Sequence, residues 1–146
     1  MVLLLAALVF FIVGVATQRE TFMLGERKNH QNLDKAELLL RTGQHKEARE
    51  AFIQAFIIGE DAKECAAGVG ECSFALFRRN SISAESFRTD LEFVAERDPA
   101  RAEYYRGCAA ELAANTDKAK QHFAKAAADG DVRAAQHLAK LTKRGK

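Results

Sequence analysis

Three apolar side chains recur at one spacing in two distant parts of the chain, and this recurrence limits the possible folds sharply. The two sets are Ala48, Phe52 and Ala55, and Ala119, Phe123 and Ala126. Intervals of four and then three residues place the side chains of each set on one face of an α-helix. The recurrence therefore indicates repeated helical units, each of which buries this face against a neighbouring unit.

Signals that begin and end helices follow one another closely after residue 28. The chain has one proline in 146 residues, so few positions interrupt a helix by removing a backbone donor. Helix ends are predicted at Gly43, Gly59 and Gly130, and helix N-caps at Ser83, Asp98 and Asp131. We expect helices over 32–41, 45–58, 62–78 and 84–97, and three more that begin at Pro99, Thr116 and Asp131, the last running to about Lys143. Short connections between them predict antiparallel helix hairpins in series.

A small residue in the first helix of each hairpin lets its two helices approach closely. These small residues are Ala36, Gly70 and Gly107. The middle unit departs from the pattern, because the bulky side chains of Phe87, Leu91 and Val94 stand at the Ala-Phe-Ala spacing there. We expect a longer turn around residues 79–83 to accommodate this shift in register.

These residues together resemble the tetratricopeptide (TPR) repeat, whose period is about 34 residues. The stretch AELLLRTGQHKEAREAFIQAF carries its small residue, turn glycine and Ala-Phe-Ala signature, and DKAKQHFAKAAADGDVRAAQHLAKL is similar to the Sel1-like relative of the repeat. The resemblance covers roughly residues 29–143. It implies an all-α domain, a TPR-like α-α superhelix of about three helix hairpins plus a C-terminal capping helix.

A partner groove follows from the same resemblance, because the first helices of successive hairpins in this family line a concave surface that holds a peptide or a helix. Carried over to this sequence, the groove residues are Leu33, Glu37, Leu40, Arg41, Glu71, Phe74, Tyr104 and Glu111, with Ala67 and Cys108 between them. An apolar floor with acidic edges suits an amphipathic or basic helical ligand. The alternative is that several of these side chains pack against neighbouring helices or lie under the last helix.

The N-terminal residues form a separate segment. Residues 2–16 are all apolar or glycine, which predicts a transmembrane anchor over residues 1–18 and a juxtamembrane linker over 19–28. The alternative is a cleaved signal peptide, because Gly14-Val15-Ala16 is a small-x-small site. Arg19, Arg27 and Lys28 follow the segment, so an anchored chain would keep its repeat domain on the cytosolic or equivalent inner side.

The sequence contains no pattern that indicates catalysis, a cofactor or a metal site, so we expect a protein that is not an enzyme. Cys65 and Cys72 lie about 10 Å apart along one helix, which is too far for a disulfide. The four histidines have no ligand-spaced partners, and Gly68-Val69-Gly70 lacks the strand and the lysine of a phosphate loop. A net charge of +2 is too small to indicate nucleic acid as a partner.

The leading functional hypothesis is a single-pass, membrane-anchored adaptor or receptor that recruits a partner protein or an amphipathic helical peptide. The layout of anchor and short repeat domain, with ELLLRTGQHKEA, is similar to that of the presequence receptors of mitochondrial protein import. A second hypothesis is a structural accessory subunit of a larger membrane protein complex, with Phe10, Phe11 and Gly14 in contact with other transmembrane helices. A third is a secreted or periplasmic repeat protein with a cleaved signal.

Overall fold

A computed structural model describes residues 31–144 of the chain. The described residues form seven α-helices and no β-strand. The helices are α2 (Gln31–Arg41), α3 (His45–Ile57), α4 (Ala62–Arg78), α5 (Ala84–Ala95), α6 (Pro99–Leu112), α7 (Thr116–Ala128) and α8 (Val132–Arg144). The all-α character is therefore confirmed, and the predicted helix bounds differ from these by two residues at most.

The predicted anchor over residues 1–18 and the linker over 19–28 lie outside the described residues. Among α2 to α8, none has both the length and the apolar composition needed to cross a lipid bilayer.

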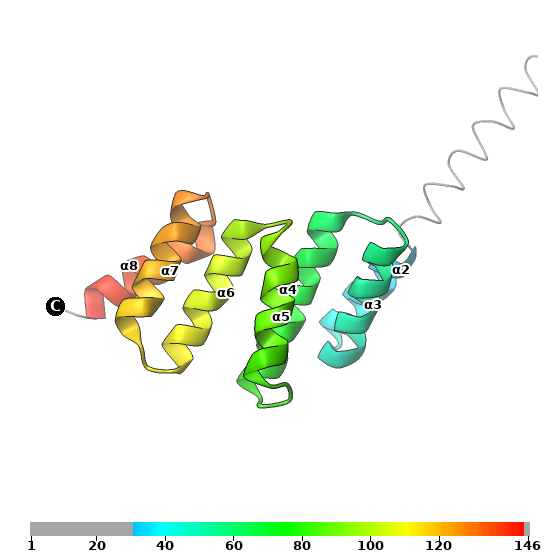
Figure 1. Ribbon diagram of the computed structural model, residues 1–146, viewed down its shortest axis with the longest axis horizontal. Coiled ribbons are helices and arrows are strands. Elements are labelled where there is room, and N and C mark those ends of the chain that lie inside the picture. The colour runs from blue at the N-terminus through cyan, green and yellow to red at the C-terminus, as the bar shows by residue number, and fades with distance from the viewer. Residues whose placement is uncertain (1–30, 145–146) are drawn as a thin grey trace, which may run out of the picture. The chain divides into compact units, whose positions relative to one another are not determined.

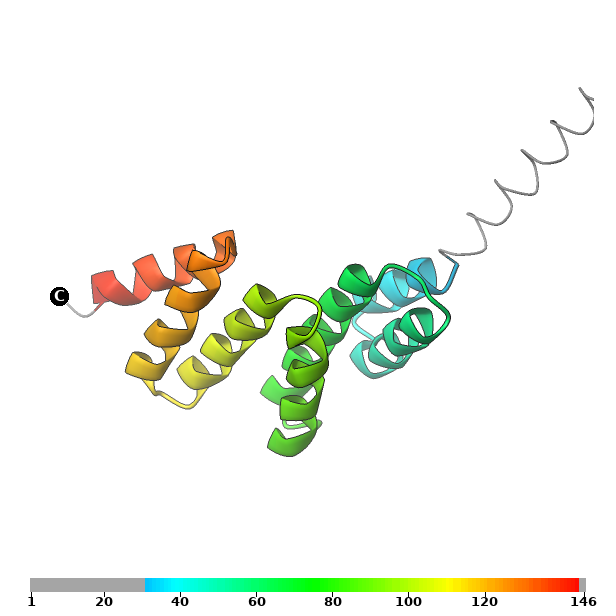
Figure 2. The same ribbon diagram turned by 45° about the horizontal axis from the view of Figure 1, so that its top comes forward.

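The helices are arranged as hairpins in series from Asn32 onward. From α3 to α8 each helix packs against the one that follows it, and α4 also packs against α6. Leu33 and Ala36 of α2 belong to the same apolar cluster as residues of α3 and α4. Figures 1 and 2 show the helices side by side in chain order, with α2 and α3 at one end of this unit and α7 and α8 at the other.

The turns between helices explain where each helix stops. Gly43 has φ +79°, and the backbone N–H of Gln44 donates to the carbonyl of Leu39 across it (2.9 Å), which is the Schellman arrangement. The turn between α4 and α5 covers residues 79–83 and is the longest of the described turns, as predicted from the shifted register of the middle repeat. There Asn80 takes the left-handed conformation with φ 56°, which asparagine tolerates better than most residues.

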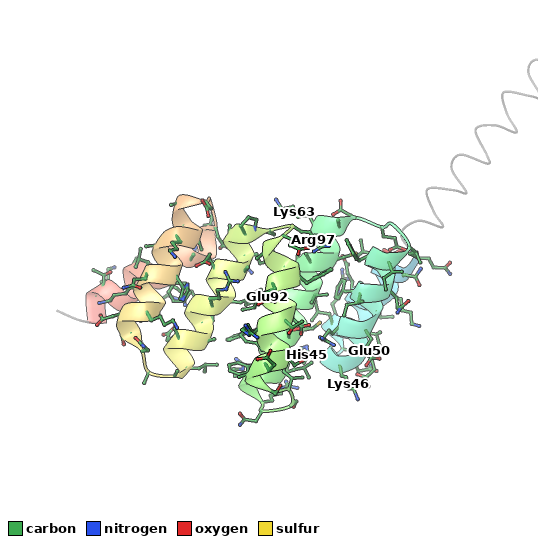
Figure 3. All side chains as sticks on the ribbon, in the orientation of Figure 1. His45, Lys46, Glu50, Lys63, Glu92 and Arg97 are labelled. Carbon is green, nitrogen blue, oxygen red and sulfur yellow. The ribbon has the colours of Figure 1, made fainter. Side chains whose placement is uncertain are left out.

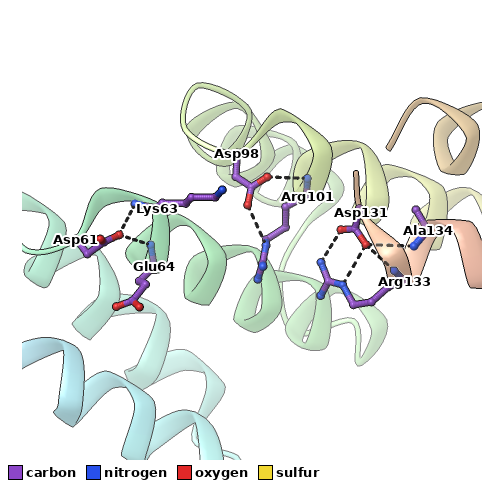
Figure 4. A network of polar contacts seen from close by, with 8 residues as sticks. All are labelled: Asp61, Lys63, Glu64, Asp98, Arg101, Asp131, Arg133 and Ala134. Atoms are coloured by element: carbon purple, nitrogen blue, oxygen red, sulfur yellow. Dashed lines mark hydrogen bonds and ion pairs between the residues drawn. The ribbon is translucent and has the colours of Figure 1, made fainter. Parts of the chain in front are cut away.

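Aspartate side chains fix the starts of α4, α6 and α8, and Figure 4 shows these three helix starts next to one another. Asp61, Asp98 and Asp131 each accept hydrogen bonds from backbone N–H groups two or three residues further on. Arg101 and Arg133 then return their guanidinium groups to Asp98 and Asp131, at 3.2 and 2.8 Å. The caps predicted at Ser83, Asp98 and Asp131 are therefore present, and α7 is capped by Asn115.

The residues of the repeat signature lie in the interior. Those buried are Ala36, Ala48, Phe52, Ala55, Gly70, Gly107, Ala119, Phe123 and Ala126. The two phenylalanines use glycines differently: the ring of Phe123 lies against Gly107 in its own hairpin, while that of Phe52 lies against Gly68 in the next one. Gly70 instead faces Tyr105 of α6. The close approach at Gly68 is one that spacing alone did not indicate.

Two contacts join α3 to α5, the second helices of the first two hairpins. Asp90 is buried and accepts hydrogen bonds from the Nε of Arg49 (2.8 Å) and the hydroxyl of Ser73 (2.6 Å). Phe56 and Phe93 meet edge to face, with ring centroids 5.0 Å apart. The guanidinium of Arg97, labelled in Figure 3, lies 4.3 and 4.1 Å from those two centroids. These contacts set the spacing between the hairpins on this side of the domain.

Candidate partner-binding groove

A depression of about 300 Å³ lies between α2 and α4, and we call it the α2–α4 groove. It is lined by Leu33, Glu37, Leu40 and Arg41 of α2, by Glu64, Ala67, Gly68 and Glu71 of α4, by Phe52 of α3 and by Arg101 of α6. Leu33, Glu37 and Leu40 are spaced by four and three residues, and Arg41 is four residues after Glu37, so all four lie on one side of α2. Glu64 and Glu71 are seven residues apart, about two turns, so they lie on one face of α4.

The floor of the groove is apolar, because the side chains of Leu33, Leu40 and Phe52 lie there next to the small residues of α4. Phe52 and Leu33 are almost fully buried, and Leu40 is half-buried. Ala67 has a small side chain and Gly68 has none, so the surface of α4 is recessed at this point. A Cβ added at Gly68 would collide with the ring of Phe52, so glycine is required for the two helices to approach this closely.

The charges around the groove leave two carboxylates without partners. Glu37 pairs with Arg41 at 2.9 Å within α2, and Arg101 pairs with Asp98. Glu64 and Glu71 are exposed and form no salt bridge with any described residue. The α4 side of the groove therefore presents net negative charge to a ligand.

The position of α2 over α4 depends on a glutamate in the turn after α3. Glu60 is buried, and its carboxylate accepts hydrogen bonds from the backbone N–H of Leu33 (2.6 Å) and of Asn32 (3.2 Å). These N–H groups belong to the first turn of α2, where no intrahelical acceptor exists for them. Glu60 thus caps α2 from 27 residues away and holds Leu33 in the floor of the groove.

Five of the eight predicted groove residues line this depression, namely Leu33, Glu37, Leu40, Arg41 and Glu71. Sequence reasoning did not include Phe52, Glu64, Gly68 and Arg101, which line it as well. Glu64 could have been predicted, because it lies seven residues before Glu71 and therefore on the same face of α4. Arg101 reaches the groove only because α6 packs against α4, which no local pattern shows.

The other three predicted residues do not reach the groove. The ring of Phe74 lies 5.7 Å from that of Tyr105, inside an aromatic cluster of α4, α5 and α6. Tyr104 lies 4.3 Å from the guanidinium of Arg133 and 5.6 Å from the ring of His137, both on α8. Glu111 lies 3.6 Å from His137. Side chains of α8 therefore occupy the part of α6 that the repeat pattern assigns to a ligand.

The cysteines lie in the core and not at the groove. Cys65, Cys72 and Cys108 are all free and buried. Burial raises the pKa of the Cys65 thiol to about 11 and that of Cys72 to about 12, so both are protonated at neutral pH. No cluster of histidine, cysteine and carboxylate side chains that could hold a metal ion occurs within residues 31–144.

Comparisons of this chain with protein-family models, with curated proteins and with solved structures find no match.

Proposed function

We propose that this protein is a membrane-anchored, TPR-like interaction module that acts as an adaptor or receptor. The observation that carries the proposal is the α2–α4 groove, in which an apolar floor of Leu33 and Leu40 stands beside the unpaired carboxylates of Glu64 and Glu71. A helix with one apolar face and basic residues along its edges complements both features. Import presequences are an example of such a ligand.

A binding measurement tests the groove directly. The full chain in detergent micelles is titrated with a fluorescent, amphipathic peptide of leucines and arginines, and with a scrambled peptide of the same composition. We expect the amphipathic peptide to bind weakly, because the groove is small and open, with a dissociation constant of up to about 100 µM. Binding should weaken as salt is added, since exposed carboxylates are screened. Equal binding of the scrambled peptide would contradict the proposal.

Charge reversal locates the binding surface. Glu71→Lys should weaken the binding of the basic peptide by about tenfold, because an attraction between opposite charges is replaced by a repulsion. Glu50→Lys is the matched control: Glu50 is exposed on α3, as Figure 3 shows, and does not line the groove. If the two variants bind the peptide equally well, the α2–α4 groove is not the binding surface.

The membrane part of the proposal depends on the apolar run over residues 2–16. Mass spectrometry of the mature N-terminus tests it. An uncleaved chain that resists alkaline extraction from membranes supports the anchor. A mature chain that starts at Thr17 would show a cleaved signal peptide instead and would overturn the anchor and its orientation together.

A further inference from the structure

A second depression, with a volume of about 430 Å³, lies across α5, α6 and α7 and shares no lining residue with the α2–α4 groove. We call it the α5–α7 groove. It is lined by Phe87, Arg88 and Leu91 of α5, by Arg106, Ala109 and Ala110 of α6, by Ala113 and Asn115 of the following turn, and by Lys118 and His122 of α7. Phe87, Leu91 and Ala110 are buried and form its apolar floor.

Every charged side chain that lines the α5–α7 groove is basic, and no carboxylate lines it. The nearby acids lie outside the lining. Glu85 and Glu92 pair with Arg88, but both of these pairs are exposed, and exposed pairs are easily exchanged for another carboxylate. Lys118 is exposed and forms no salt bridge with any described residue.

Glu103 orients two of the basic groups without using up their donors. Its carboxylate receives one N–H of Arg106 at 2.6 Å and faces Nδ1 of His122 at 2.7 Å. A guanidinium has five N–H donors, so four of those on Arg106 remain for a ligand. The Nδ1 of His122 donates to the carboxylate, which can only accept, and the Nε2 is outside that contact. The amide nitrogen of Asn115 is also outside its capping bond, which uses Oδ1.

From this arrangement we propose that the α5–α7 groove binds an acidic segment of a partner protein, with an apolar side chain on the floor and carboxylates at Arg88, Arg106 and Lys118. The floor of Phe87 and Leu91 favours such a segment over a bare phosphate or a nucleic-acid backbone, which would leave apolar surface uncovered. The charge is opposite to that of Glu64 and Glu71. Two surfaces of opposite charge would let one chain bridge a basic and an acidic partner. This second surface extends the proposed adaptor role, but its binding of an acidic segment does not depend on that role.

Nuclear magnetic resonance of the isotope-labelled full chain in micelles tests this proposal. The probe is acetyl-Glu-Glu-Leu-Phe-Glu-Glu-amide, with acetyl-Lys-Lys-Leu-Phe-Lys-Lys-amide as the peptide of opposite charge. We expect the acidic peptide to shift the backbone amides of Ala110, Ala113 and Asn115 in a saturable manner, and the basic peptide to leave them in place. Saturable shifts at these amides with inorganic phosphate alone would assign the groove to phosphate groups and overturn the proposal.

Variants then separate the groove from general charge effects. Lys118→Glu should weaken the binding of the acidic peptide at least about fivefold. Lys118 lies in the first turn of α7, where an acid is favourable, so the variant should stay folded. The matched control is Lys140→Glu on α8, which lines no groove described above and should leave binding unchanged.

Three further results would overturn the proposal: equal losses in the two variants, peptide shifts centred on the α2–α4 groove, or no saturation at millimolar peptide. A failure here leaves the binding of the basic peptide in the α2–α4 groove intact, so the two proposals are tested separately.

Discussion

The carboxylate of Glu60 accepts a hydrogen bond of 2.6 Å from the backbone N–H of Leu33, and these two residues are 27 positions apart in the chain. The contact joins the turn after α3 to the first turn of α2. It matters for function because Leu33 lines the α2–α4 groove. One buried acid therefore connects the stability of α2 with the shape of the candidate binding surface.

Glu60→Ala should lower the free energy of unfolding by about 1–2 kcal/mol, because two N–H groups of α2 lose their acceptor. Urea unfolding measures the loss. Hydrogen exchange in the first turn of α2 should be faster in the variant than in the unchanged chain, while exchange in α6 and α7 should change less. Glu50→Ala, on the exposed surface of α3 beyond its first turn, is the control and should have little effect. Unchanged exchange at Leu33 in Glu60→Ala would show that the cap does not hold α2.

Gly68→Ala should destabilise the domain even though alanine favours helices. The gain in helix propensity is about 1 kcal/mol. The new methyl group meets the ring of Phe52, which is only 2% exposed, so overpacking should cost more than this gain. We expect a net loss of about 1–2 kcal/mol in urea unfolding. Phe52→Leu in the same chain should restore part of it, and strictly additive losses would show that the two residues do not clash.

Asp90→Ala should be among the most destabilising single substitutions in the domain. It removes the acceptor shared by Arg49 and Ser73 and leaves a partly buried guanidinium unpaired, at a cost of about 3 kcal/mol. The exposed pair of Arg88 and Glu85 supplies the comparison, because Glu85→Ala should cost less than about 1 kcal/mol. Thermal unfolding of both variants checks the ratio. Similar losses would mean that the Asp90 contacts add no more than a surface pair.

Stability in acid should depend on Glu103. Burial opposes its ionisation, but hydrogen bonds from His122 and Arg106 outweigh burial and lower the pKa of this carboxyl below its usual 4.5. A lowered folded-state pKa stabilises the protein above 4.5, and that stability is lost as the pH falls from 4.5 through the folded value. Glu103→Gln should therefore lose less stability than the unchanged chain across this range. Urea unfolding at several pH values measures both slopes, and parallel slopes would contradict the assignment.

The sequence by itself determined the helices, because the signals that start and stop a helix act over a few residues. Gly43 ends α2 through its own positive φ, and Asp98 caps α6 through the N–H of Arg101, three residues away. The Ala-Phe-Ala sets also identified buried helix faces correctly, since periodicity reports which side of a helix is apolar.

Only the tertiary structure decided which faces meet. Phe52 packs on Gly68 of the next hairpin, Glu60 caps a helix 27 residues earlier, and side chains of α8 cover Tyr104. These contacts depend on the angles and distances between helices, which side-chain volumes set across the whole domain. The composition of both grooves follows from that packing. A helix pattern could therefore assign Leu33 to the groove but could not bring Arg101 into the same depression.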